Sequence, residues 1–284
     1  MKTGNFERCL GYGCLLMVLA AITPVIAMDD PTVDPTHFDL YIETTPAAQT
    51  GARFQIDPDD SFPVDILSGR TVVPTNLSDI AGGPHLTDDP GWFIEPGFLI
   101  DGEDLRFRAL GALSYWDPAV GIWQNTVPNG ETVRIFGGVP SDIIADLFAD
   151  LDLFQFWLDG TIWSTDGIEG PPEAVIAETR SGDNGQVHSH LDFCIQDAGG
   201  DCPSSIGGNP AAGAYRIELE LFSSAQAGTA NKYVDSRPVM IVLGYELTPD
   251  QLQAAVDSLT QIPPSTQDVP QLPASGVLIM GGPE

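Results

Sequence analysis

Polar and apolar side chains alternate along the stretch Gln186–Cys194, which reads QVHSHLDFC. Successive side chains of a β-strand point to opposite faces, so this alternation predicts a strand with one polar and one apolar face. The polar face carries His188 and His190, whose backbone positions in a strand lie about 6.5 to 7 Å apart. Two imidazoles at this spacing can converge on one ion, while the apolar face anchors the strand in a core.

The same alternation occurs in other segments of the chain. Residues 37–43 place His37 and Asp39 on one face, and residues 215–222 also alternate. Residues 239–245 are almost continuously apolar, which is typical of a central strand. Pairs of Gly, Pro, Asp and Asn that favour turns separate these short segments. We therefore expect an all-β fold, an antiparallel β-sandwich of jelly-roll or immunoglobulin-like type.

One or two short helices are expected at the periphery of this sandwich. Ser141 is a helix cap, and apolar residues follow it at helical spacing as far as Leu151. Thr248 is a second cap, with Pro249 at the first helical position and Gln251 at the capping-box position.

The chain is expected to divide into three parts. Residues 1–27 combine basic residues, an apolar run and a small residue before a cleavage point, which is typical of a secretory signal peptide. Residues 28–262 would form the β-sandwich domain, and residues 263–284 a flexible linker and tail. No apolar run in the mature chain reaches the roughly 20 residues of a membrane-spanning helix. We expect an exported protein that is periplasmic, attached to the cell surface or extracellular.

The cysteines support the same compartment. Cys9 and Cys14 would leave with the signal peptide, so that Cys194 and Cys202 remain. Two cysteines this close together in an exported protein favour a disulfide that closes a short loop. Ligation of a metal ion by the two thiolates is the alternative.

The protein is strongly acidic, with 40 Asp and Glu against 11 Lys and Arg and a formal net charge of -29. Nucleic acids and anionic membrane surfaces are bound by clustered Lys and Arg, so we expect neither as a partner. Such a negative net charge is typical of a secreted protein in a medium of high salt concentration, or of a protein that binds or transfers cations. Most of the carboxylates are expected on the solvated surface.

The protein has four histidines, and their positions suggest a metal site. The candidate ligands are His37, His85, His188 and His190, with Asp39 or Asp192 as a further ligand or as an acceptor that orients an imidazole. Zinc (Zn2+) is the expected ion and copper (Cu2+) the alternative, since exported proteins hold both through imidazole and carboxylate. The simpler interpretation is that these histidines lie on a partly exposed strand face or in a turn and bind nothing.

Other chemistry has less support. The acidic turns at residues 57–60, 88–89 and 101–104 offer oxygen ligands for calcium (Ca2+), but none has EF-hand spacing, and a solvated turn is the simpler interpretation. The chain contains no nucleophile elbow, phosphate loop, dinucleotide fingerprint or His-Glu-x-x-His motif. A zinc ion with three protein ligands would still permit hydrolysis or lyase chemistry, with Tyr41 or Glu43 as the acid or base.

Two resemblances concern the tail and the body of the chain. The tail Val269–Gly282 resembles the Val-Pro-x-Pro-Ala class of C-terminal sorting signals, which is related to the PEP-CTERM type. The class continues with a transmembrane stretch and a basic cluster, which do not follow in this sequence, and Gln271 is an extra residue, so we expect a truncated or degenerate version of the signal.

The body resembles the zinc-regulator-repressed PEP-CTERM protein family of cyanobacteria, through residues 37–39, 84–91 and 188–193. Repression by a zinc-sensing regulator implies a role when zinc is scarce, and hence binding or delivery of zinc outside the cytoplasm.

The leading hypothesis is an exported zinc-binding or copper-binding protein that uses histidines in metal acquisition, storage or delivery. The second is a structural or adhesive surface module, calcium-stabilised, that binds a cell-surface or exopolysaccharide component and whose histidines are incidental. The third is a metal-dependent hydrolase or lyase. The sequence does not decide whether the protein is an enzyme.

Overall fold

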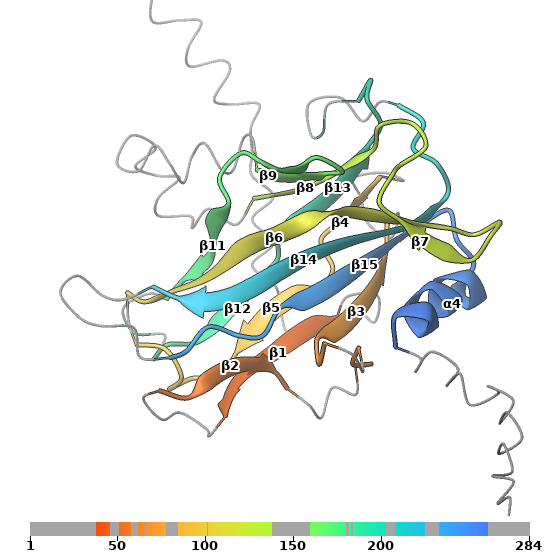
Figure 1. The fold of residues 1–284 in the computed structure, drawn as a ribbon. Helices are drawn as coiled ribbons and strands as arrows, with labels where there is room; N and C mark the ends of the chain where they lie inside the picture. Colours follow the sequence, from red (N-terminus) through yellow and green to blue (C-terminus); the bar gives the residue numbers. More distant parts are fainter. Residues whose placement is uncertain are drawn as a thin grey trace, which may run out of the picture.

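The computed structural model describes residues 38–45, 51–57, 62–65, 68–77, 85–100, 102–137, 160–179, 182, 184–200, 202, 208–224 and 233–260 (Figure 1). Strands and a single helix make up most of these ranges. Their bounds are β1 Asp39–Thr45, β2 Arg53–Ile56, β3 Thr71–Asn76, β4 Leu86–Thr87, β5 Gly91–Ile94, β6 Asp104–Asp117, β7 Ile122–Gln124, β8 Thr132–Phe136, β9 Thr161–Ser164, β10 Gly167–Glu169, β11 Glu173–Glu178, β12 Val187–Ser189, β13 Asp192–Gln196, β14 Gly213–Ser223, β15 Val239–Tyr245 and α4 Pro249–Thr260. The expected signal peptide and the expected tail lie outside the described residues.

The strands form three sheets. The largest has the order β11-β6-β14-β15-β3, with β7 paired to β6, and its long strands run side by side across Figure 1. The second has the order β12-β5-β1-β2, and the third the order β10-β9-β8-β13-β4. The all-β, sandwich-like fold is therefore confirmed. The expected antiparallel pattern holds for most pairs, but β1 pairs with β5 in parallel and β15 pairs with β3 in parallel.

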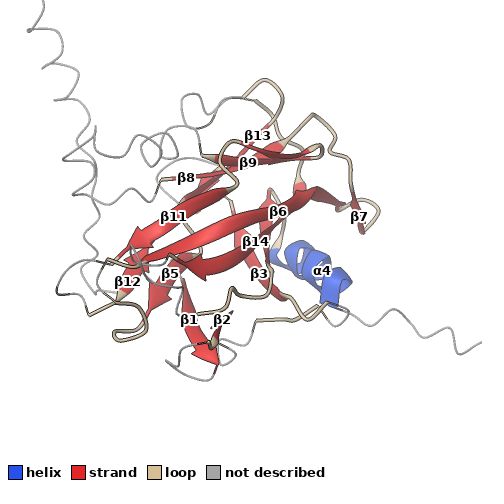
Figure 2. Ribbon diagram, turned by 60° about the vertical axis from the view of Figure 1, so that its left-hand side comes forward, coloured by secondary structure: helices blue, strands red, loops and turns tan. Residues whose placement is uncertain are grey.

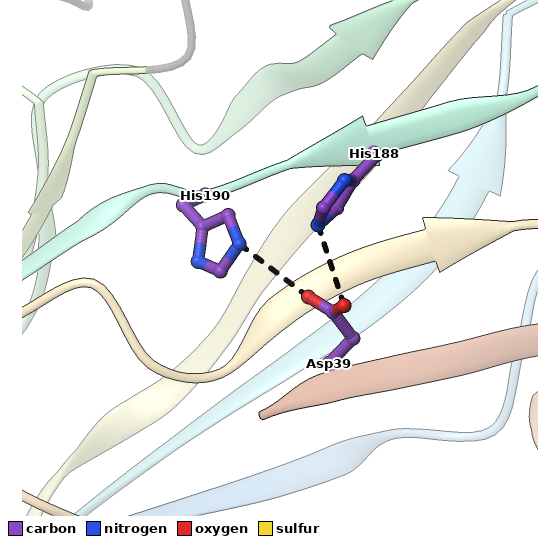
Figure 3. Close-up of side chains that lie close together, drawn as sticks. All are labelled: Asp39, His188 and His190. Atoms are coloured by element: carbon purple, nitrogen blue, oxygen red, sulfur yellow. Dashed lines mark ion pairs between the residues drawn. The ribbon is translucent and has the colours of Figure 1, made fainter. Parts of the chain in front are cut away.

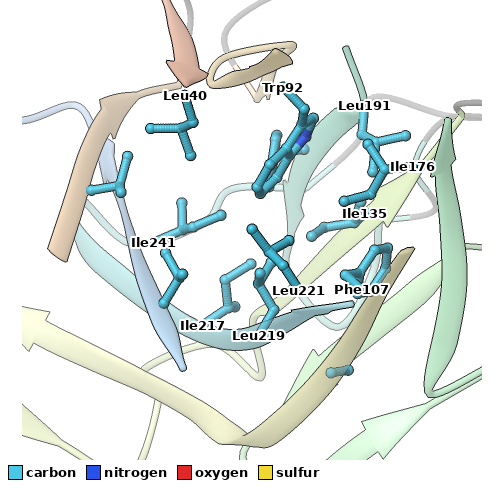
Figure 4. Close-up of a cluster of buried hydrophobic side chains, with 14 of the residues drawn as sticks. Leu40, Trp92, Phe107, Ile135, Ile176, Leu191, Ile217, Leu219, Leu221 and Ile241 are labelled. Carbon is cyan, nitrogen blue, oxygen red and sulfur yellow. The ribbon is translucent and has the colours of Figure 1, made fainter. Parts of the chain in front are cut away.

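The core lies between the inner faces of the sheets (Figure 4). Leu40 of β1 and Trp92 of β5 are fully buried, and they face Ile217, Leu221 and Ile241 of the largest sheet. Complete burial of an aliphatic side chain of this size stabilises the fold by roughly 1.5 to 3 kcal/mol. The inward positions of β1 and β5 alternate with outward ones, so one face of this sheet is free to carry polar groups.

The stretch Gln186–Cys194 does not form one strand, in contrast to the expectation from its alternation. β12 ends at Ser189 and pairs with β5, whereas β13 begins at Asp192 and pairs with β8 and β4. The chain passes from one sheet to another at His190 and Leu191. Leu191 is fully buried in the shared core, and burial of this side chain turns the chain inward.

The expected C-terminal helix is confirmed as α4, which packs beside β3 and β7 (Figure 2). Leu252, Ala255 and Val256 form its buried stripe. Thr248 and Gln251 form a reciprocal cap, since the amide of Thr248 donates to Oε1 of Gln251 and the amide of Gln251 donates to Oγ1 of Thr248. The helix expected after Ser141 lies outside the described residues. In the ranges that the structure describes, no helix is long and apolar enough to cross a membrane.

The expected disulfide is also confirmed. Cys194 of β13 is bonded to Cys202, with the two Cα atoms 6.3 Å apart. Both residues are buried beside Phe136. The bond therefore attaches the loop after β13 back to β13 itself, and both cysteines pack against Phe136 of β8.

Candidate metal centre

Strand β5 is the centre of the polar face, with β1 on one side and β12 on the other. Asp39 of β1 lies opposite Gly91 of β5. His188 of β12 lies opposite Phe93, and its ring meets that of Phe93 edge-on at a centroid distance of 5.8 Å. His190 follows β12 directly after Ser189. Asp39 adjoins the buried Leu40 and His188 adjoins the buried Val187, so the side chains of Asp39 and His188 lie on the outer face of the sheet, next to His190.

Three side chains converge on this face (Figure 3). Nε2 of His188 lies 3.3 Å from Oδ2 of Asp39, and Nε2 of His190 lies 3.4 Å from Oδ1 of Asp39. Each of the three residues offers one ligand atom, and these atoms all lie within 4.8 Å of one another. The side chains of Asp39 and His190 are 24% and 20% exposed and that of His188 is 38% exposed, so the group is anchored but open to solvent.

The hydrogen bond on the far side of His190 identifies the atom that faces Asp39. Nδ1 of His190 lies 3.1 Å from the backbone oxygen of Asp88. A carbonyl oxygen only accepts, so Nδ1 carries the proton, and in the neutral imidazole Nε2 then presents a lone pair. This nitrogen lies 3.4 Å from Oδ1 of Asp39, a buried oxygen that accepts no hydrogen bond within the described part of the chain. Two acceptors in contact require a proton or a cation between them.

The spacing of the ligand atoms is compatible with a small tetrahedral metal ion such as zinc. Zinc binds imidazole nitrogen and carboxylate oxygen at about 2.0 to 2.2 Å, so two ligands of a tetrahedral ion lie about 3.4 Å apart. Each imidazole nitrogen is close to this distance from one oxygen of Asp39, His188 at 3.3 Å from Oδ2 and His190 at 3.4 Å from Oδ1. Two imidazoles and one carboxylate also suit copper, whereas calcium requires six or more oxygen ligands.

A second group combines Asp88, Asp89 and His190. Asp89 is almost completely buried, and its Oδ1 accepts the amide of Phe38 at 3.3 Å. The amide of Asp89 bonds to Oγ1 of Thr87. Asp89 thus holds the start of β1, and Asp88 holds the ring of His190 through its backbone oxygen. Sequence reasoning missed these two supporting roles, and the only signal was a pair of aspartates at the end of a loop rich in Gly and Pro.

Not every predicted ligand lies in this cluster. His85 precedes β4, which belongs to the sheet of β13, and the residue is buried, at 7% exposure. Its Nε2 lies 3.1 Å from the hydroxyl of Tyr245, and it belongs to neither of the two groups. The sequence cannot tell that β4 and β5, only three residues apart, pair in different sheets. His37 lies outside the described residues, and its role as a ligand stays a prediction.

Asp192 is near the site without being a member of either group. Burial, and after it the charge of Asp88, raise the pKa of Asp192 from 3.8 to about 6, although the charge of His190 acts to lower it. The break between β12 and β13 accounts for its position, since it separates Asp192 from the face that carries the two histidines.

The other acidic turns offer no comparable group in the ranges that the structure describes. Residues 58–60 and 101 lie outside them. Glu103 is buried, and its Oε2 accepts the amide of Ile100 within its own turn. This carboxylate therefore stabilises the turn.

Comparison with protein-family models and with curated proteins finds no match to this chain.

Proposed function

We propose that this protein is an exported zinc-binding protein, with copper as the alternative ion, and that it serves metal acquisition, storage or delivery outside the cytoplasm. Asp39, His188 and His190 are the ligands in this proposal. The observation that carries it is the contact of both Nε2 atoms with one carboxylate, at 3.3 and 3.4 Å, on an open face of the sheet.

The accessibility of the site supports exchange of the ion. Three protein ligands leave at least one position of a four-coordinate zinc ion for water or for a donor from another molecule. His188 is the most exposed of the three at 38%, so an incoming chelator can approach from its side. A storage or delivery protein needs such access, whereas a structural zinc ion is enclosed by four protein ligands.

Two observations support a location outside the cytoplasm. The disulfide between Cys194 and Cys202 is of the kind that persists in oxidising compartments. The first 27 residues have the composition of a signal peptide. The resemblance of residues 37–39, 84–91 and 188–193 to the zinc-regulator-repressed PEP-CTERM family agrees with a role in zinc supply.

The test is metal binding by the purified mature protein. We expect one zinc ion per chain with micromolar or tighter affinity by competition with a chromophoric chelator, and we expect the double variant His188→Ala/His190→Ala to lose it. The matched control is His85→Ala, which removes a histidine outside the cluster and should keep wild-type affinity. Unchanged zinc affinity in the double variant would refute the site.

A further variant tests the fourth ligand. His37 precedes Asp39 by two residues and remains a predicted ligand. If it completes the coordination, His37→Ala lowers zinc affinity by at least about ten-fold while His85→Ala does not. Equal affinities of the two variants would leave water or an external donor in that position.

A metal-dependent hydrolase is a second candidate, because three protein ligands and one open position are typical of catalytic zinc. The activity of the zinc-loaded protein towards ester and phosphoester substrates separates the two proposals. A hydrolase should lose turnover in Asp39→Ala, whereas a binding protein should show no turnover above that of this variant.

A further inference from the structure

Gly91 lies directly beneath the side chains of Asp39 and His190 in the metal centre. It is the first residue of β5 and lies opposite Asp39, and its amide donates to the backbone oxygen of Phe38 at 2.9 Å. Figure 3 shows the side chains of Asp39 and His190 directed towards each other across this strand.

A side chain at position 91 would occupy the space of the ligands. A Cβ atom there would lie 2.1 Å from Oδ1 of Asp39, 2.5 Å from Cε1 of His190 and 2.7 Å from Nε2 of His190. All three distances are far below van der Waals contact. The three atoms that it would meet belong to two of the proposed ligands, and two of them are the ligand atoms of the 3.4 Å contact.

The backbone conformation does not explain this glycine. Gly91 is not among the residues with a positive φ, so its backbone is of a kind that any L-residue adopts. Glycine in a strand is otherwise unfavourable, since it loses more conformational freedom on folding than other residues, and it often marks a place where a ligand approaches the backbone. The space above Gly91, and not its flexibility, therefore accounts for its presence.

We propose that Gly91 is a positioning residue that sets the spacing of Asp39 and His190, and that its missing side chain makes the site fit a small tetrahedral cation. This inference rests on the proposed function. The backbone next to Gly91 is held in place, because the amide of Gly91 bonds to the oxygen of Phe38 and the amide of Phe38 bonds to Asp89. A methyl group at position 91 must consequently displace the carboxylate and the imidazole and not the strands.

The main test is Gly91→Ala in the full mature protein. The atoms that the methyl group meets are the ends of side chains, so the metal-free variant should fold and melt within a few degrees of the wild type. Its zinc affinity should fall by about 10 to 100-fold, the usual effect of changing a residue that orients a metal ligand. The cobalt-substituted variant should also lose the intense visible absorption of tetrahedral cobalt.

The matched control is Gly199→Ala. Gly199 likewise lacks a positive φ, and a Cβ there would meet only Oδ1 of Asp197, at an ordinary 3.4 Å. This variant should keep the zinc affinity and the cobalt spectrum of the wild type.

A double-mutant cycle connects the effect to Asp39. With Asp39→Ala in place, the nearest of the three atoms that the new methyl group meets is gone and only the edge of the His190 ring remains, so Gly91→Ala should cost less zinc affinity than it does in the wild type. The same double variant should fold even if the single Gly91→Ala variant does not.

The outcomes are distinct. If the wild type binds zinc and Gly91→Ala binds it equally well with an unchanged cobalt spectrum, Gly91 has no positioning role and this inference is wrong. Additive losses in the cycle with Asp39→Ala would also contradict it. If the wild type itself binds no zinc, the proposed function fails first.

Discussion

Replacing Asp192 by asparagine tests the electrostatics beside the metal centre through the pH dependence of stability. The pKa of Asp192 is raised from 3.8 to about 6, first by burial and then by the charge of Asp88. Between these two pH values the folded protein holds a proton that the unfolded chain has released. The free energy of unfolding of the metal-free protein therefore decreases as pH rises from about 4 to about 6, and it is flat above that range for this group.

The magnitude follows from the size of the shift. Each unit of pKa difference corresponds to about 1.4 kcal/mol, and the partial solvent exposure of Asp192 reduces the sum to about 2 kcal/mol over the whole interval. An amide side chain carries no charge at any of these pH values. Asp192→Asn should therefore match the wild type near pH 4 and exceed its stability by about 2 kcal/mol at pH 7.

The assay is denaturant unfolding in the presence of a chelator at several pH values from 4 to 7. Asp197→Asn is a control of opposite sign. The pKa of Asp197 is lowered, chiefly by the hydrogen bond from the amide of Asn209 and then by that from Gly199, so its contribution is lost as pH falls and not as it rises. Parallel pH profiles of the wild type and Asp192→Asn would refute the reasoning.

Two further predictions concern the core and the disulfide. Leu221→Ala removes a fully buried side chain and should lower the free energy of unfolding by about 3 kcal/mol. The control Val120→Ala, at a position that is 59% exposed, should change it little. Equal effects of the two variants in denaturant unfolding would contradict the core assignment. Cys194→Ser/Cys202→Ser opens the short loop after β13 and should lower the free energy of unfolding by about 2.5 kcal/mol. Chemical reduction of the wild type should lower it by the same amount. A reduced protein that is as stable as the oxidised one would argue against the bond.

Much of the fold could be predicted from local patterns. Alternation along residues 39–43 correctly separated the buried Leu40 and Ile42 from the outward Asp39, because side chains of a strand point to opposite faces whatever their partner is. The cap at Thr248 correctly predicted helix α4, since a capping box is satisfied within a few residues. The division of Gln186–Cys194 between two sheets could not be predicted, because both halves keep the same alternation.

Of the three proposed metal ligands, two could be grouped from local sequence and the third could not. His188 and His190 were expected together, since two positions on one strand face are neighbours by local geometry alone. Their meeting with Asp39 depends on the antiparallel pairing of β12 with β5 and on the parallel pairing of β5 with β1, which join segments that are far apart in the chain. Register between distant strands depends on the packing of the whole core, so the sequence pattern does not specify it.

The sequence by itself determined the all-β class, the polar face of two strands and the kinds of residue that could bind a metal ion, and it favoured a disulfide between Cys194 and Cys202. Only the tertiary structure decided that Asp39 joins the two histidines, that His85 instead contacts Tyr245, and that Gly91 leaves room beneath the ligands. The physical reason is that face and turn preferences are local properties of the chain, whereas the contacts of 3.3 and 3.4 Å between ligand atoms arise from sheet register and side-chain burial.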